Sequence, residues 1–205
     1  MKLSMIVIAT VMSACGGSDA VHPDASPDAS PDAVTNPPAV VQGTIGGVAF
    51  VPRDAIWTTA NASGFDFDKQ STVVMVTDFA DACALQGSDT GVPNGRLLLF
   101  VLATTDATGA SSPITATGVY DEFRGQAPPS RQLVEPYYEI DDAHCLGTTK
   151  HFGSAGSVTV TSVTDPQTAT FDVTFDSGDH ATGSYRATAC AALNPNRTPL
   201  GGCPH

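Results

Sequence analysis

The sequence predicts an all-β domain, an antiparallel sandwich or a barrel-like sheet, that follows an export signal and a tether. In the second half of the chain, apolar and polar residues alternate with a period of two, most clearly in residues 157–163 and 171–176. Such alternation is typical of strands that bury one face. Residues 97–103 are continuously apolar, which is typical of a strand buried on both faces. Gly, Pro, Asn and Asp separate eight or nine such segments, so we expect a single domain over residues 41–205.

The expected strands follow from the same criteria in chain order. They are residues 44–51, 55–59, 73–76, 97–103, 114–120, 133–140, 157–163, 171–176 and 180–187. Pro136 interrupts one of them, and a helical turn is indicated only over residues 78–85. Residues 176–179 place Gly178 at a position where a hairpin turn requires a positive φ, which predicts a tight turn between the last two strands. The spacing leaves both the sandwich and the barrel open.

The N-terminus predicts export. Lys2 is the only charge in the first seventeen residues, residues 3–12 are mostly apolar, and the small residues Ser13 and Ala14 follow. This order is typical of a signal peptide, and the apolar stretch is shorter than the roughly 20 residues that span a bilayer. We therefore expect residues 1–14 to be a signal peptide that is removed.

The run Met12-Ser13-Ala14-Cys15 resembles the lipobox of bacterial lipoproteins, although Leu is more usual where Met12 stands. The resemblance implies that Cys15 carries a diacylglyceryl thioether and, after cleavage, an N-acyl chain such as palmitate. Two or more acyl chains give a stable membrane anchor. Gly16, rather than Asp, follows the cysteine, and in such lipoproteins this implies the outer membrane.

Residues 15–40 predict an extended tether. The unit Pro-Asp-Ala-Ser repeats over residues 23–33, and Pro37 and Pro38 close the stretch. The prolines remove backbone donors, the aspartates repel one another, and nothing in the segment packs a core. We expect a disordered spacer between the lipid anchor and the domain.

The overall charge limits the partners. The 205-residue chain has 9 Lys and Arg against 21 Asp and Glu, a net charge of −12. Nucleic-acid binding requires a basic face, so we expect no nucleic-acid partner. The charge also disfavours electrostatic docking on anionic lipid. The acyl chains on Cys15 are therefore the expected contact with the membrane.

Five cysteines are an odd number for an exported protein. Lipidation of Cys15 leaves Cys83, Cys145, Cys190 and Cys203, which we expect to form two disulfides in an oxidising compartment. Three connectivities are open. We favour Cys190–Cys203, which would tie the C-terminal tail to the last strand, together with Cys83–Cys145. The sequence has no CxxC pair that would indicate a zinc site.

Residues 139–145 gather several ligands that metals prefer, with Asp141 and His144 as the candidates. Such groups can hold Ca²⁺ or Zn²⁺, but a site usually draws ligands from a distant segment, and only His151 is near in sequence. We expect a solvated acidic loop before a disulfide, and no metal.

Asp179 and His180, close to Asp176, form a second cluster. A histidine beside carboxylates can act as a metal ligand or a general base. Because Asp and Gly are favoured in turns, we expect these residues to shape the hairpin loop instead. The motifs of hydrolases, P-loops and dinucleotide-binding folds are absent, so we assign no catalytic residue and no cofactor.

Residues 156–165, 170–180 and 183–185, with Cys190, resemble the C-terminal part of uncharacterised lipoproteins with similar tethers in large-genome Gram-negative bacteria. The resemblance implies architecture and a location in the cell envelope. We expect a lipid-anchored, extracytoplasmic and non-enzymatic domain that binds a surface protein or a glycan or serves a structural role. The alternatives are a secreted hydrolase or metal-dependent enzyme that uses His144 and His180, and a small-ligand carrier.

Overall fold

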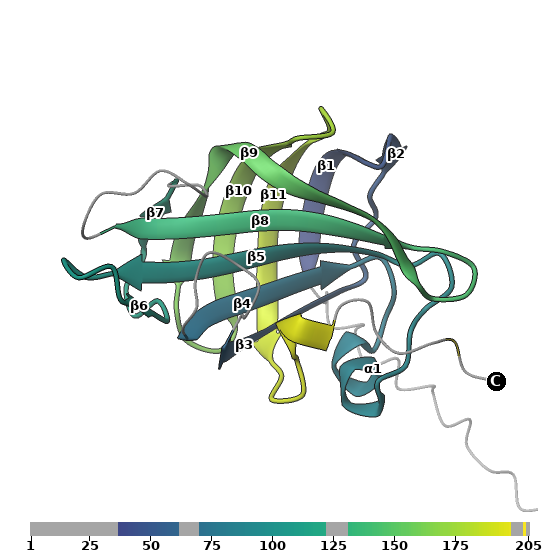
Figure 1. The fold of residues 1–205 in the computed structure, drawn as a ribbon, viewed down its shortest axis with the longest axis horizontal. Coiled ribbons are helices and arrows are strands. Elements are labelled where there is room, and N and C mark those ends of the chain that lie inside the picture. Colours follow the sequence, from purple (N-terminus) through teal and green to yellow (C-terminus); the bar gives the residue numbers. More distant parts are fainter. Residues whose placement is uncertain (1–36, 62–69, 122–130, 198–202, 204–205) are drawn as a thin grey trace, which may run out of the picture. The chain divides into compact units, whose positions relative to one another are not determined.

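The structure is a computed structural model that describes residues 37–61, 70–121, 131–197 and 203 (Figure 1). The expected signal peptide, the lipidation site Cys15 and the tether up to residue 36 lie outside these ranges. Within them, no helix is long and apolar enough to cross a membrane.

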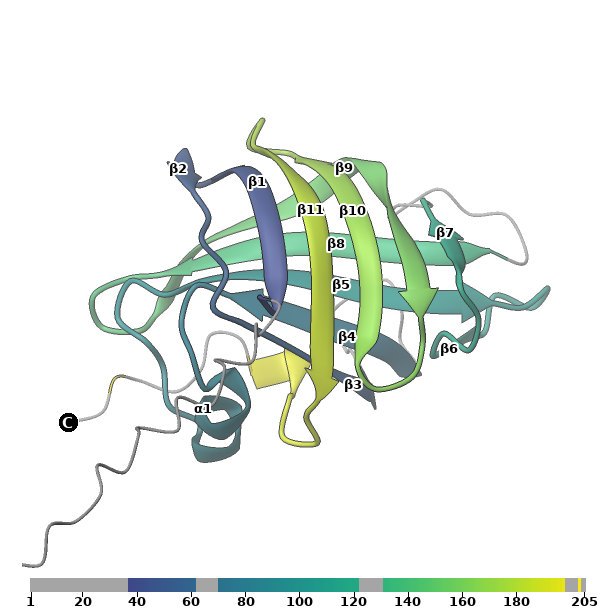
Figure 2. The ribbon, with the colours of Figure 1, turned by 180° about the vertical axis from the view of Figure 1, so that it is seen from behind.

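Strands dominate the described residues (Figures 1 and 2). They are β1 (Ala39–Ile45), β2 (Val48–Ala49), β3 (Asp54–Asn61), β4 (Gln70–Thr77), β5 (Arg96–Thr105), β6 (Ser111–Ser112), β7 (Gly118–Tyr120), β8 (Gln132–Asp141), β9 (Gly147–Ser162), β10 (Gln167–Phe175) and β11 (His180–Ala189). One α-helix, α1 (Ala82–Ser88), and a 3-10 turn over Pro195–Arg197 complete these elements.

Seven of these strands close into a barrel, so the fold is all-β and barrel-like rather than a sandwich. The ring runs β3–β4–β5–β8–β9–β10–β11, and β11 returns to β3. Six neighbouring pairs are antiparallel, whereas β3 and β11 pair in parallel where the ring closes, at a seam that the sequence did not indicate. Seven strands that alternate in direction around a ring must place two strands of the same direction side by side. The first half of β11 pairs instead with β1.

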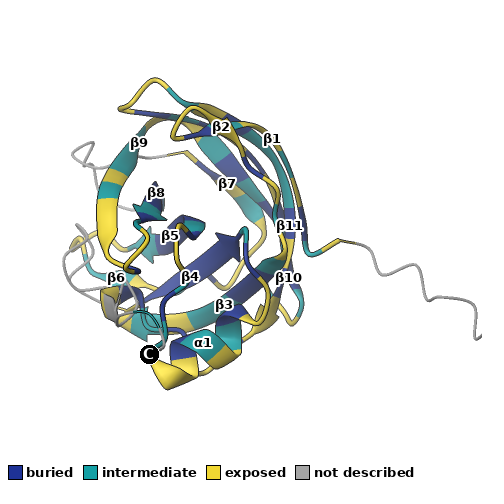
Figure 3. Cartoon of the chain, turned by 90° about the vertical axis from the view of Figure 1, so that its right-hand side faces the viewer, coloured by how far each residue is buried: buried dark blue, intermediate teal, exposed yellow. Residues whose placement is uncertain are grey.

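Two layers of apolar side chains stabilise the barrel, and Figure 3 marks the buried residues along its strands. In the interior, the ring of Phe100 packs against those of Phe171 and Tyr185, with centroids 4.9 and 5.6 Å apart. The second layer covers the outer face of β3, β4, β5 and β8 and includes residues of α1 and of the segment after β11. The strand β5 contributes to both layers, and residues 97–103 are all buried. The prediction of a strand buried on both faces is confirmed.

Three expected strands differ most from the structure in their bounds. The segment 44–51 is a hairpin, because Gly46 and Gly47, with φ of 62° and 72°, turn the chain between β1 and β2. The segment 114–120 pairs with β9 only over β7. The segment 157–163 is the end of β9, which begins ten residues earlier, at Gly147. The first part of β9 shows no alternation, because it crosses from β8 to β10 and is bent at register shifts.

The helical turn expected over residues 78–85 is a short helix, α1, that begins later, at Ala82. Its first amide is held by β3, since the carboxylate of Asp54 accepts a 2.9 Å hydrogen bond from the N–H of Ala82. The apolar side chains of α1 pack on the outer layer of the barrel. The helix is thereby fixed against the strand that forms the seam.

All four expected cysteines form disulfides, but the favoured pairing is wrong. The bonds are Cys83–Cys190 and Cys145–Cys203, with Cα atoms 5.7 and 5.2 Å apart. Packing of α1 beside the end of β11 brings Cys83 to Cys190, across 107 residues of sequence. Cys145 lies in the turn between β8 and β9, and its disulfide with Cys203 attaches the C-terminal tail to this turn. Nearness in sequence favoured Cys190–Cys203, whereas the tertiary fold decides the pairs.

Candidate functional site

A groove lies on the outside of the barrel, beside the C-terminal half of β3. It has a volume of about 400 Å³ and is lined by residues 58–61 of β3, 86–87 of α1 and 191–194 after β11. We call it the β3-edge groove. It arises from the seam, because β11 pairs with β3 only at Ile56 and Trp57 and leaves the rest of that edge without a partner strand among the described residues.

The backbone pattern of β4 determines which groups of β3 face the groove. Asp78, which follows β4, donates its N–H to the oxygen of Arg96 at 3.1 Å, so even-numbered residues of β4 bond β5 and odd-numbered ones bond β3. In the β3–β4 register, the odd-numbered residues of β4 lie opposite even-numbered residues of β3. The N–H and C=O groups of Trp57, Thr59 and Asn61 therefore point away from β4 and toward the groove.

The segment after β11 covers this edge only at its two ends. Cys190 donates its N–H to the oxygen of Trp57 at 2.8 Å, and the side-chain amide of Asn196 donates to the oxygen of Asn61 at 2.7 Å. Between them the chain turns away and buries Leu193 in the outer apolar layer. No hydrogen bond between described residues uses the backbone of Thr59 on this edge.

Gln86 lies at the inner side of the groove and is fully buried. Its Oε1 accepts a 3.4 Å hydrogen bond from the N–H of Asn194, and its Nε2 donates to the sulfur of Met75 at 3.7 Å. The described lining residues carry amide, hydroxyl and aliphatic groups, and none of these residues is charged or aromatic. Such a lining suits a neutral ligand that forms hydrogen bonds.

The acidic segment before Cys145 does not converge with other described residues into a group that could hold a metal ion. Asp141 is buried, and its Oδ1 has no hydrogen-bond partner among the described residues. Burial, together with the carboxylates of Glu139, Asp142 and Asp78, raises the pKa of Asp141 to about 6. His144 lies 3.8 Å from Asp142, and its side chain is 84% exposed. The two sequence candidates of this segment, Asp141 and His144, are thus in different surroundings.

Asp179 is a structural anchor of the turn before β11. Its carboxylate accepts hydrogen bonds from the hydroxyls of Thr44 and Tyr138 at 2.8 and 2.7 Å. It also accepts hydrogen bonds from the backbone N–H groups of Gly46 and Gly47, each with an N···O distance of 3.1 Å. Partial burial acts to raise the pKa of Asp179, but the hydrogen bonds outweigh it and lower the pKa to about 2. The expectation that this residue shapes the hairpin loop agrees with these contacts.

The remaining histidines of the barrel bond separate carboxylates. His180 lies 2.8 Å from Asp172, and His151 lies 2.7 Å from Asp176, both on exposed parts of the β9–β10–β11 surface. Asp176 and His180, neighbours in the sequence cluster, thus have different partners. Across the described ranges, no three His, Cys, Asp or Glu residues are arranged to hold a metal ion.

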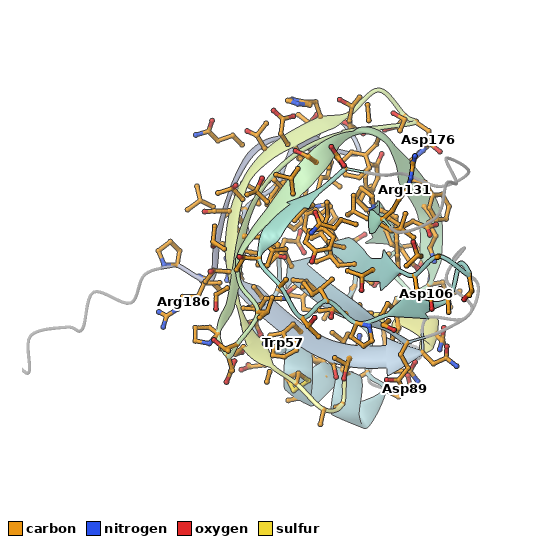
Figure 4. The ribbon with its side chains drawn as sticks, turned by 90° about the vertical axis from the view of Figure 1, so that its left-hand side faces the viewer. Trp57, Asp89, Asp106, Arg131, Asp176 and Arg186 are labelled. Carbon is orange, nitrogen blue, oxygen red and sulfur yellow. A yellow bond between two sulfur atoms is a disulfide. The ribbon has the colours of Figure 1, made fainter. Side chains whose placement is uncertain are left out.

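Three polar side chains inside the barrel bear on the small-ligand alternative. Trp57 Nε1, the amide of Gln167 and the hydroxyl of Tyr185 are buried and have no hydrogen-bond partner among the described residues. Gln167 lies opposite Ala187 on β11, two residues from Tyr185 on the same face. Figure 4 shows Trp57 pointing into the barrel, whereas Arg186 points away from its wall.

Sequence reasoning did not identify the β3-edge groove. Its residues are small or neutral and carry no motif. The one usable signal is the pair Ala191-Ala192 directly after Cys190, where the alternation of the last strand stops. The position of that pair beside β3 follows from the Cys83–Cys190 disulfide, which the sequence did not predict.

No protein-family model matches this chain, and neither does any curated protein or solved structure. The groove, the histidine–carboxylate pairs and the polar groups inside the barrel that lack a partner among the described residues are the features from which a function can be proposed.

Proposed function

We propose that this chain is a lipid-anchored domain of the cell envelope that binds a partner noncovalently and without catalysis, with the β3-edge groove as its binding site. Cys15 is the proposed anchor. The outer membrane is the proposed location, with the domain on its periplasmic or surface side. The Pro-Asp-Ala tether supports this arrangement, because a spacer lets a domain reach beyond the membrane to which it is attached.

The observation that carries the binding role is the groove itself. It combines a volume of about 400 Å³ with backbone donors and acceptors on one wall and the Gln86 amide on another. Binding pockets are typically concave, of a few hundred Å³, with a small number of placed polar groups. The Cys83–Cys190 disulfide and the Asp54–Ala82 hydrogen bond hold its walls in place before any ligand arrives. A preorganised site of this kind loses little entropy on binding.

The test uses arrays of peptides and of glycans, probed with the purified full chain and two variants. Gly87→Trp fills the groove, since a Cβ on Gly87 would lie 3.6 Å from the Cβ of Ala192 and the backbone there accepts a side chain. Ala107→Trp adds the same side chain on the exposed turn between β5 and β6. We expect the wild type and Ala107→Trp to bind the same ligands, and Gly87→Trp to lose at least about tenfold in affinity.

Two results would contradict the proposal. If every array ligand binds Gly87→Trp as well as it binds the wild type, or if none binds at all, the groove is not a binding site. If the wild type converts an array ligand into a product, the domain is an enzyme. Thermal melts that match the wild type establish that both tryptophan variants are folded.

A further inference from the structure

We propose that the β3-edge groove binds an extended segment of another polypeptide, which adds to β3 as a short extra strand through the backbone of Thr59. This inference rests on the binding role proposed above and names the class of partner. Peptide addition to an exposed sheet edge is a general mode of recognition, in which main-chain hydrogen bonds provide affinity.

Within the part of the chain that the structure describes, the barrel leaves one stretch of the β3 edge without a partner strand. A closed ring of strands removes edges, because each strand is paired on both sides. At the seam, β11 covers β3 only as far as Trp57, and the next bond to this edge is the one from the Asn196 side chain to Asn61. Thr59 lies midway between them, and its N–H and C=O point in the same direction, toward the groove.

The length of this stretch suits a short segment. From Trp57 to Asn61 an extended strand spans roughly 14 Å at about 3.4 Å per residue. The N–H and C=O of Thr59, with the N–H of Asn61, can bond an incoming chain, whereas the oxygens of Trp57 and Asn61 already accept hydrogen bonds. We therefore expect a partner to bond this edge over about three residues.

The walls of the groove favour small side chains on the partner. Gly87 and Ala192 face each other closely enough that a Cβ on the glycine would reach 3.6 Å from its neighbour. Ala60 and Ala191 add two further methyl groups to the lining. A partner main chain that lies along β3 therefore has room only for Gly, Ala, Ser or Thr on its side facing Gly87 and Ala192, whereas large side chains would have to point outward.

The chemistry of the lining favours a peptide over a glycan. An extended peptide offers alternating N–H and C=O groups, which complement a strand edge at regular spacing. Sugar sites commonly use aromatic rings as flat apolar surfaces, and none of the lining residues that the structure describes is aromatic. The described part of the lining is also uncharged, and the main-chain groups of Thr59 are directional polar groups within it.

The test measures amide hydrogen exchange of the full chain with a positional-scanning library of acetylated hexapeptides as the probe. We expect at least one pool to slow the exchange of the Thr59 amide tenfold or more, while amides of β5 stay unchanged. Methylation of alternate backbone nitrogens in the active peptides should abolish the effect in one register and preserve it in the other, because only one set of N–H groups faces β3.

Two variants of Thr59 separate backbone from side-chain recognition. Thr59→Pro removes the N–H that faces the groove but no hydrogen bond to β4, and edge positions of strands accept proline. Thr59→Val keeps the N–H and changes only the side chain. We expect Thr59→Pro to lose peptide binding tenfold or more and Thr59→Val to keep it. Gly87→Trp provides a second block if Thr59→Pro fails to fold.

The outcomes distinguish this inference from the proposed function. Strand addition is overturned if Thr59 is protected in the free chain, if no pool protects it, or if peptides bind equally well to Thr59→Pro. It is also overturned if a glycan, and no peptide, binds in a manner that Gly87→Trp abolishes, and in that case the groove remains the binding site. If neither peptides nor glycans respond to Gly87→Trp, the proposed function fails as well.

Discussion

The carboxylate of Asp179, in the turn between β10 and β11, accepts a 2.7 Å hydrogen bond from the hydroxyl of Tyr138 on β8. Tyr138 is fully buried, and its ring packs edge-on against Phe175 with centroids 4.9 Å apart. The same carboxylate holds the β1–β2 hairpin through Thr44. One charged side chain therefore connects three parts of the barrel that are distant in sequence.

Replacement of this carboxylate should destabilise the barrel. Each oxygen of the Asp179 carboxylate accepts a hydrogen bond from one backbone N–H, of Gly46 or of Gly47, so the N–H₂ of Asp179→Asn must face one of these donors and lose that bond. We expect a loss of about 2–4 kcal/mol in the free energy of unfolding at pH 7, measured by urea titration. Asp172→Asn is the matched control, because Asp172 is exposed and bonds only His180 among the described residues. A loss as large in the control would contradict the role of Asp179.

The pH dependence of the Asp179 contribution has a defined sign. The pKa of Asp179 is lowered from 3.8 to about 2, so the folded state binds fewer protons than the unfolded state between these values. Its contribution of about 2 kcal/mol is therefore present above pH 4 and is lost as the pH falls through 2. The stability difference between wild type and Asp179→Asn should shrink over this window.

Asp141 should behave in the opposite way. Burial and neighbouring carboxylates raise its pKa to about 6, so the folded state binds more protons than the unfolded state between pH 3.8 and 6. The contribution of Asp141 to stability thus falls as the pH rises through this window. We expect Asp141→Asn to be more stable than the wild type at pH 7, by up to about 3 kcal/mol, and equal to it below pH 4.

The control for Asp141 is its neighbour in the sequence. The pKa of Asp142 is lowered, chiefly by a hydrogen bond from the N–H of Leu146, so its charged form stabilises the fold. Asp142→Asn should therefore lose stability at pH 7. A gain in both variants would mean that reduction of the negative charge, rather than burial of Asp141, sets the effect.

The sequence predicted the barrel strands wherever alternation reflects one buried face. Residues 171–176 and 180–187 alternate because β10 and β11 have the barrel interior on one side and solvent on the other. Residues 97–103 are apolar throughout because β5 lies between two layers. These patterns come from local burial, which a sequence records directly. The closure into a barrel depends on the seam between β3 and β11, which no local pattern records.

The β3-edge groove could not be predicted from the sequence, because it too depends on contacts between residues that are distant in the chain. The groove exists because the chain leaves β3 at Cys190 and returns at Asn196, and both contacts join residues more than 130 positions apart. The partners of Asp179 and His180 are likewise set by strand register. Short-range proximity in sequence suggested a shared cluster for these two residues, but Asp179 lies in the turn and bonds Tyr138 on β8, whereas His180 begins β11 and bonds Asp172 on the neighbouring strand β10.

Removal of each disulfide should destabilise the domain to a different extent. The chain-entropy model gives upper estimates of about 5 kcal/mol for Cys83–Cys190 and about 4 kcal/mol for Cys145–Cys203, from loops of 107 and 58 residues. We expect the double variant Cys83→Ala/Cys190→Ala to unfold at lower urea than Cys145→Ala/Cys203→Ala. The Cys83→Ala/Cys190→Ala variant should also weaken ligand binding in the groove, because the lining residues 191–194 directly follow Cys190 and lose the disulfide that holds them.

Non-reducing mass mapping checks the same pairs directly. It should recover peptides that link Cys83 to Cys190 and Cys145 to Cys203, with no free thiol in the folded domain. Recovery of a Cys190–Cys203 link would contradict the structure.

The proposed lipid anchor predicts a change of compartment. Cys15→Ser removes the thiol that the acyl chain requires, so the variant should appear in the soluble fraction, whereas the wild type sediments with membranes. Cys203→Ser is the control, because it removes a cysteine of the folded domain and should stay with the membranes. Retention of Cys15→Ser on membranes after a high-salt wash would place the anchor elsewhere.

The amide of Gln167 tests whether the barrel interior is dry. Its residue is fully buried, and neither amide atom has a hydrogen-bond partner among the described residues. An unsatisfied buried polar group costs about 1–3 kcal/mol, so Gln167→Leu should raise the free energy of unfolding by about 1–2 kcal/mol. Gln86→Leu is the control and should lower it, because Gln86 accepts a hydrogen bond from Asn194. A loss of stability in Gln167→Leu would mean that the amide has a partner inside the barrel in solution, and this would favour the small-ligand carrier.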